Sequence, residues 1–390
     1  PISVEVLSPS SDSAPAGSFD VEVKVGDDVV ENYSSVTLGA GNSNVATVVN
    51  TASKLIRIEE QTLTADLIKA GIDPTTLTLA VPSDVAIVEI DASSVIGDTA
   101  QRTGFSGFEM HEDITMIVAP DLAVAHRNGL VDLDGFKAVQ SALITHCELM
   151  GNRMAILDSP AGMNAQEVSD WRMNTTGYDS KFAALYWPWI NMLDPAVGHN
   201  VVFPPSGHVA GLWASNDSSR GVFKAPANEV LQGALGIEVN ATRGEMDLLN
   251  PQGVNTIKAF PGRGVRVWGA RTLSSDAEWR YINVRRYFNY LEESILQGTQ
   301  WCVFEPNDDK LWGRIRRTIS AFLVNEWRSG ALFGAKAEQA FFVTCDGTNN
   351  TAESIDAGMV VVDIAVAPVK PAEFIVFRLA QFSGGSSISD

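Results

Sequence analysis

Three neighbouring stretches decide the fold: ITMIVAP at 114–120, LDGFKAVQSALITHCELM at 133–150 and RMAILD at 153–158. The first and third are short apolar runs of strand length, and the first ends at a proline. The second carries apolar residues at helical spacing, and Gly151, a common helix terminator, follows it. A strand, a helix and a strand joined by short connections predict a parallel or mixed sheet with both faces covered.

Predicted strands and helices continue to follow one another toward the C-terminus. A helix from 311 to 328 follows Asn307 and Asp308, either of which is well placed to cap it. The patterns also predict helices at 165–172, from 206 and at 279–297, and strands at 182–186, 264–268, 301–304, 340–345, 359–366 and 374–379.

The N-terminal part differs in pattern. Residues 2–7 alternate as in a strand, a hairpin is expected around 26–28, and residues 61–110 predict a surface loop region. The chain is therefore expected to be an α+β multidomain protein with three parts. These are a β-rich part at 1–110, an α/β domain with a mixed sheet at 111–260, and an α+β domain at 261–390.

Charge is spread unevenly over the 390 residues, whose net charge is −19. Residues 1–150 hold 22 acidic and 7 basic side chains, whereas residues 251–330 hold 8 acidic and 12 basic ones. Such an acidic chain is a poor ligand for nucleic acid or an anionic membrane, and its apolar runs are too short for membrane insertion. The uneven distribution favours association with copies of itself or with an acidic partner.

Few residues suggest enzyme chemistry. Asp121 and Asp158 follow predicted strands, where α/β enzymes place catalytic groups, so a hydrolase that uses Asp121 or Asp158 is the alternative function. A loop carboxylate that caps the following helix explains them equally well. His146 beside Cys147 is better explained by packing than by a metal, because adjacent helical residues diverge by about 100°. The sequence predicts no catalytic residue, cofactor or metal.

Two features suggest interaction surfaces. The helix at 311–328 has an apolar stripe and a second face with Arg314, Arg317 and Arg328, which is either a solvated surface or a partner site. After 367–371, a terminal strand precedes the flexible composition of 383–387 and suits pairing with another chain, although an internal strand with a frayed end is the alternative. This strand comprises Phe374, Ile375, Val376, Phe377, Arg378 and Leu379.

Eight segments carry a family resemblance, in family order: PSGHVAG (205–211), RGVFKAPAN (220–228), LNPQGVN (249–255), FPGRGVRVWGARTL (260–273), WRYINVRR (279–286), FEPN (304–307), AFFVTCD (340–346) and VAPVKPAEF (366–374). In these segments the chain resembles contractile tail sheath proteins of phages and of phage-tail-like contractile injection systems. The match is weaker over 110–200.

The resemblance implies a non-enzymatic subunit of a helical sheath around an inner tube, which contracts to drive that tube through a target envelope. It implies partners, namely other copies of the chain, the inner tube protein, and baseplate and terminal cap proteins. It also implies assembly in the bacterial cytoplasm as part of a phage tail or similar particle, released as a virion or an extracellular particle.

The resemblance further implies roles for the parts. The domain at 261–390 would face the inner tube, with Arg314, Arg317 and Arg328 toward an acidic tube surface. The strand at 374–379 would pair with the sheet of a neighbouring subunit. Residues 1–110 would be an outer domain, which we expect to be incomplete at its N-terminus because family members usually begin with a Pro-Gly-Val-Tyr-type arm.

Overall fold

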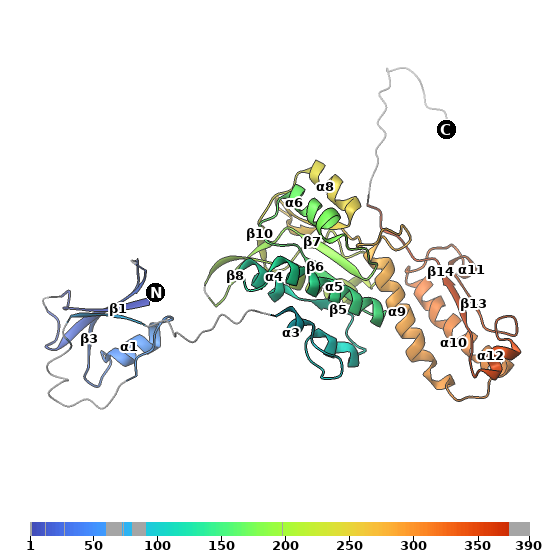
Figure 1. The fold of residues 1–390 in the computed structure, drawn as a ribbon, viewed down its shortest axis with the longest axis horizontal. Helices are drawn as coiled ribbons and strands as arrows, with labels where there is room; N and C mark the ends of the chain where they lie inside the picture. The colour runs from blue at the N-terminus through green and yellow to red at the C-terminus, as the bar shows by residue number, and fades with distance from the viewer. Residues whose placement is uncertain are drawn as a thin grey trace, which may run out of the picture. The chain divides into compact units, whose positions relative to one another are not determined.

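The computed structural model describes residues 2–59 except 12 and 27, residue 72, residues 74–79, and residues 91–373 except 197. The chain divides into two compact units, Pro1–Val88 and Glu89–Asp390 (Figure 1). The limits 1–110, 111–260 and 261–390 stay predictions, because this division separates only two units.

Within the described residues, the first unit contains a four-stranded antiparallel sheet in the order β3-β2-β1-β4 and the helix α1. Its elements are β1 (Ile2–Leu7), β2 (Ser18–Val25), β3 (Asp28–Thr37), α1 (Val45–Ala52) and β4 (Thr75–Thr78). The β-rich character and the β2–β3 hairpin are as predicted. Alternate strand residues and α1 form the core, which comprises Val6, Phe19, Val21, Val36, Val45 and Val49.

The second unit is built on a five-stranded sheet in the order β12-β11-β7-β6-β5. The strands β5 (Met116–Val118), β6 (Met154–Asp158), β7 (Ala183–Trp187) and β11 (Val254–Phe260) are parallel, and β12 (Gly264–Val267) pairs antiparallel with β11. The predicted mixed sheet is therefore confirmed.

Both faces of this sheet are covered, because side chains of a strand alternate between faces. In β6, Ala155 and Leu157 pack into one core, and Met154 and Ile156 pack into the other. The first core is formed with α4 (Pro120–Arg127), α5 (Leu133–Met150), α6 (Ala165–Asp170) and α8 (Arg243–Leu249), and Figure 1 shows α4 and α5 over the sheet. The second is formed with α7 (Ser206–Arg220) and β10 (Ala234–Ile237), which joins β8 (Ile190–Asp194) and β9 (His199–Phe203) in a small antiparallel sheet. The short π-helix η2 (Trp171–Thr176) and the 3-10 helix η3 (Asn250–Gln252) complete this region.

The prediction of a loop region at 61–110 is wrong for Thr75–Thr78, which form β4 and pair with β1. It is also wrong for residues 92–110. They form α3 (Ala92–Ile96) and η1 (Phe105–Met110), with Phe105 in the core against α5. The fully buried Arg153 donates to the carbonyl oxygens of Phe108 at 2.9 Å and His111 at 2.6 Å. This tertiary contact holds a segment that has no periodicity of its own.

The C-terminal part pairs two long helices with a hairpin. α9 (Ile282–Thr299) and α10 (Asp309–Arg328) lie side by side (Figure 1), and β13 (Phe341–Thr344) pairs antiparallel with β14 (Asp363–Val366). The short helix α11 (Ala337–Ala340) precedes β13, and α12 (Ala352–Asp356) lies in the connection between β13 and β14. Apolar side chains of both long helices form the core, among them Tyr287, Leu291, Leu311, Ile315, Ile319 and Leu323.

The predicted strand at 301–304 is wrong. The short helix η4 (Gln300–Cys302) stands there, and Val303 and Phe304 are exposed. The run is apolar, but it forms the connection between α9 and α10 and does not enter a sheet.

Candidate interaction surfaces

The exposed side of α10 carries four cations, which we call the basic face: Lys310, Arg314, Arg317 and Arg328. The opposite side is buried, because Leu311, Ile315 and Leu323 recur at helical spacing. Asp308 precedes the helix, and its carboxylate accepts a hydrogen bond from the backbone N–H of Leu311 at 2.9 Å. Asp308 rather than Asn307 is therefore the cap.

The basic face is largely free of intramolecular ion pairs. Among the described residues only Arg314 has one, with Glu305 at 4.0 Å, and both side chains are about half exposed. The Arg314 guanidinium also stacks over the ring of Trp301, 4.3 Å from its centroid. Arg316 belongs to another side of the helix, 3.8 Å from Asp346. Arg317 and Arg328 are thus exposed without an ion pair in the described part of the chain, and Arg314 is about half exposed beside Glu305 and Trp301.

An ion pair anchors the segment that leads to the C-terminus. Arg271 Nη2 lies 2.6 Å from Glu373 Oε2, and Arg271 Nε lies 3.0 Å from Glu373 Oε1. The two side chains are 9% and 12% exposed, and the Tyr281 hydroxyl donates to the same carboxylate at 3.3 Å. Burial, and then the negative charge of Glu373, raise the pKa of Tyr281. A bidentate, largely buried ion pair of this kind fixes both the position and the orientation of the Glu373 carboxylate.

Backbone and side-chain hydrogen bonds hold the residues before Glu373. The Ala367 N–H donates to Ala340 O at 2.8 Å, and the Val369 N–H donates to Ala331 O at 3.2 Å. The Asn283 amide donates to Val369 O at 3.1 Å. Residues 367–373, which we call the anchored segment, therefore connect the hairpin to the sheet domain along a defined path.

The strand predicted for Phe374–Leu379 lies outside the described residues, so its pairing stays a prediction. Sequence reasoning missed the ion pair between Arg271 and Glu373, the last described residue before this segment. Arg271 and Glu373 lie in two of the segments that carry the family resemblance, and their opposite charges were the available signal.

The β13–β14 hairpin offers a place for a further strand. Each strand pairs with only one other strand within the described residues, so each retains an open edge. Open edges present unpaired N–H and C=O groups, to which a segment of another chain can add by backbone hydrogen bonds.

The two candidate carboxylates have different surroundings. Asp121 is exposed in the first turn of α4. Asp158 is 3% exposed, and its carboxylate accepts a hydrogen bond from the backbone N–H of Ser206 at 2.9 Å. Burial raises the pKa of Asp158 to about 7. Asp158 therefore caps α7 and not the next helix, α6, which Asn164 caps, and it is closed to a substrate.

His146 and Cys147 are packing residues. Burial raises the pKa of the Cys147 thiol to about 12, and burial together with the nearby Arg153 lowers the pKa of His146. Within the described residues there is no group of three or more His, Cys, Asp or Glu side chains that could hold a metal ion. The same residues contain no helix with the length and apolar character needed to cross a membrane.

Comparisons with known proteins agree on one family. The phage tail sheath central domain matches residues 130–273, and the phage tail sheath C-terminal domain matches residues 274–382. The helical sheath of the anti-feeding prophage in its contracted state is 34% identical, with a TM-score of 0.60, over 70% of this chain and 72% of that one. The sheath of the extracellular contractile injection system PVC, also contracted, is 38% identical, with a TM-score of 0.57, over 62% and 68%.

A putative prophage major tail sheath protein of Pseudomonas aeruginosa is 27% identical over 75% of this chain and 73% of its own length. The chain spans between 33% and 73% of the length of the curated relatives that it matches.

Proposed function

This chain belongs to the phage tail sheath family, and on that premise we propose that it is a subunit of a contractile sheath. The subunits polymerise helically around an inner tube and contract to drive the tube through a target envelope. The similar chains from the contracted anti-feeding prophage and PVC particles, at 34% and 38% identity, are the observation that carries this proposal.

The proposed partners follow from the same premise. They are other copies of the chain, an inner tube protein, and baseplate and terminal cap proteins. A similar chain occurs in the baseplate of the anti-feeding prophage, which supports the baseplate contact. We place assembly in the bacterial cytoplasm, as part of a phage tail or an injection particle that is later released as a virion or an extracellular particle. The proposal assigns no catalytic role and no membrane or nucleic-acid contact to the chain.

The basic face is proposed to hold an acidic inner tube. Its cations are exposed, and three of the four have no ion pair among the described residues. Exposed charge pairs contribute only about 0–1 kcal/mol each, so many of them hold a tube in register and still release it during contraction.

The C-terminal strand is proposed to link neighbouring subunits. Phe374–Leu379 starts directly after Glu373, whose carboxylate is fixed by Arg271, and the hairpin edges of a neighbour can accept a strand. Backbone pairing of this kind survives a large rotation of the subunits, because it depends on few side-chain fits.

Charge reversal on the basic face tests the proposal. The double variant Arg314→Glu and Arg317→Glu, expressed with the inner tube protein, should give few extended particles or prematurely contracted ones, because like charges repel. Negative-stain microscopy measures the fraction of extended, striated tubes.

The matched control is Lys54→Glu with Arg57→Glu, which makes the same charge change on exposed residues of the first unit. It should leave extended particles intact. Normal extended particles from the Arg314/Arg317 variant would refute the role of the basic face, and dispersed wild-type monomers would refute the sheath function itself.

A further inference from the structure

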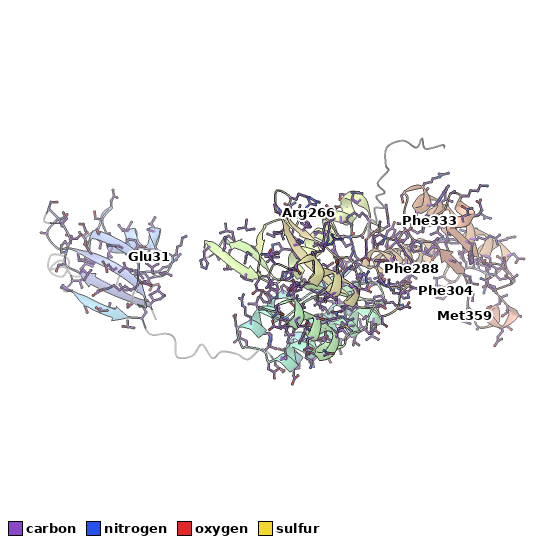
Figure 2. The ribbon with its side chains drawn as sticks, turned by 90° about the horizontal axis from the view of Figure 1, so that it is seen from above. Glu31, Arg266, Phe288, Phe304, Phe333 and Met359 are labelled. Carbon is purple, nitrogen blue, oxygen red and sulfur yellow. The ribbon has the colours of Figure 1, made fainter. Side chains whose placement is uncertain are left out.

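Phe304 is displayed to solvent in an unusual backbone conformation. Its relative exposure is 102%, and its φ angle is +67°, in the left-handed region that large side chains rarely adopt. Val303 is 61% exposed, and Met359 is 53% exposed. Figure 2 labels Phe304 and Met359, which lie at the same end of the C-terminal part. We call these three residues the apolar tip.

The apolar tip is rigidly braced. The backbone N–H groups of Val303 and Glu305 donate to Gln300 O and Cys302 O, each at 3.2 Å. Asn307 donates through its amide nitrogen to Met359 O at 3.0 Å, and its amide oxygen accepts from the buried Trp312 indole at 2.7 Å. One side chain thus connects the Phe304 loop, the Met359 loop and the core, so Phe304 is held outward before any partner arrives.

Folding of the single chain does not explain this arrangement. A left-handed backbone conformation strains every residue type except glycine, and it strains asparagine and aspartate less than the others. A fully exposed phenylalanine also gains nothing from burial in the subunit. Strain and exposure together at one braced residue are typical of a site where an aromatic side chain anchors a partner.

The surroundings of Phe304 define the chemistry of that partner. The residues on both sides of the loop contact the basic face, because Arg314 stacks on Trp301 and lies 4.0 Å from Glu305. The apolar tip therefore adjoins Arg314 in the second turn of α10. A surface that complements both features has an apolar recess bordered by carboxylates.

We propose that Phe304 is the apolar anchor of the interface made by the basic face, and that it inserts into an apolar recess of an acidic protein surface. This inference rests on the proposed function, under which that surface belongs to the inner tube. The cations bring the two surfaces together and Phe304 fixes the register, since apolar burial in a recess depends on shape whereas screened charge pairs do not.

Phe304→Gly is the sharpest test, because glycine accepts φ +67° without strain. The complete subunit carrying this change should unfold at the same temperature as wild type or a higher one. In co-sedimentation with preassembled inner tubes, its affinity should fall by about tenfold or more. The loss should be the same at low and high salt, whereas Arg314→Glu with Arg317→Glu should lose affinity chiefly at low salt.

Leu149→Ala is the control, because Leu149 is also an exposed apolar side chain, on α5. It should bind tubes like wild type. If the Phe304→Gly subunit binds tubes with wild-type affinity while the arginine variant does not, Phe304 is not an anchor, but the basic face still contacts the tube. A Phe304→Gly subunit that binds tubes normally but no longer polymerises without them would also overturn the proposal, because the anchor would then contact a second copy. Normal binding by both variants would overturn the basic face as well.

Discussion

At the scale of single residues, Asp158 shows how a candidate catalytic group serves the fold. Its carboxylate ends β6 and accepts the backbone N–H of Ser206 at the start of α7. Burial raises its pKa to about 7, from the 3.8 of an exposed aspartate. The native state therefore binds a proton more tightly than the unfolded chain between those two values, and the stability that Asp158 provides falls as the pH rises through that window.

Asp158→Asn should remove this pH dependence, because a carboxamide keeps the acceptor oxygen and has no charge to bury. Relative to wild type, the variant should gain free energy of unfolding between pH 5 and pH 8, on the order of 3 kcal/mol. Urea denaturation of both proteins at the two pH values measures the gain. An equal difference between the proteins at both pH values would contradict a buried, titrating Asp158.

At the scale of elements, the anchored segment follows a fixed path as far as Glu373. Residues 367–373 contribute no regular structure, yet backbone bonds to Ala331 and Ala340 and the Arg271–Glu373 pair hold them. Removing one partner of a largely buried pair leaves the other charge without compensation, which is costly. The segment is therefore a structural element in its own right.

Glu373→Gln should loosen this element while the domains stay folded. The loss of one charge from the pair should cost about 1–3 kcal/mol locally. Hydrogen exchange at the Val369 amide should accelerate, and sheath polymerisation should decline. Glu292→Gln is the matched control, because Glu292 pairs with Arg285 but is 62% exposed, and it should change neither. Unchanged exchange at Val369 in the Glu373 variant would show that the pair does not anchor the segment.

At the scale of the whole molecule, the two units have separate cores. Among the described residues, the core of the first unit is formed between Val4 and Ile58, and the three cores of the second unit contain none before Ala92. Each unit therefore buries its own apolar surface and has what a domain needs to fold alone.

A chain that begins at Glu89 should accordingly fold without the first unit. Calorimetry should show an unfolding transition that coincides with one transition of the longer chain, because separate cores make nearly independent contributions to stability. Slow-exchanging amides in β6 and β7 would identify the retained domain. Loss of that transition, or of the protected amides, would show that the first unit stabilises the second.

Local pattern by itself determined much of this protein. The apolar run of β6 predicted a strand buried on both faces, the stripe from Leu133 to Met150 predicted α5, and the cap choice at 307–308 included the residue that starts α10. The resemblance in eight segments indicated the family before any geometry. These features are readable because periodicity, caps and turn residues act within a few positions of the chain.

Only the tertiary structure decided the rest. In the fold, the apolar run at 301–304 is exposed at the apolar tip and not buried in a strand. Residues 92–110 pack within the second unit, where Arg153 donates hydrogen bonds to two carbonyl oxygens at 108 and 111. The fold also joined Arg271 to Glu373, 102 positions apart, and connected Asp158 to a helix 48 positions away. Residue spacing along a chain records which side of an element is apolar, but it does not record which distant group meets a given side chain. Burial, charge pairing and backbone strain depend on these contacts between distant residues, so only the tertiary structure shows them.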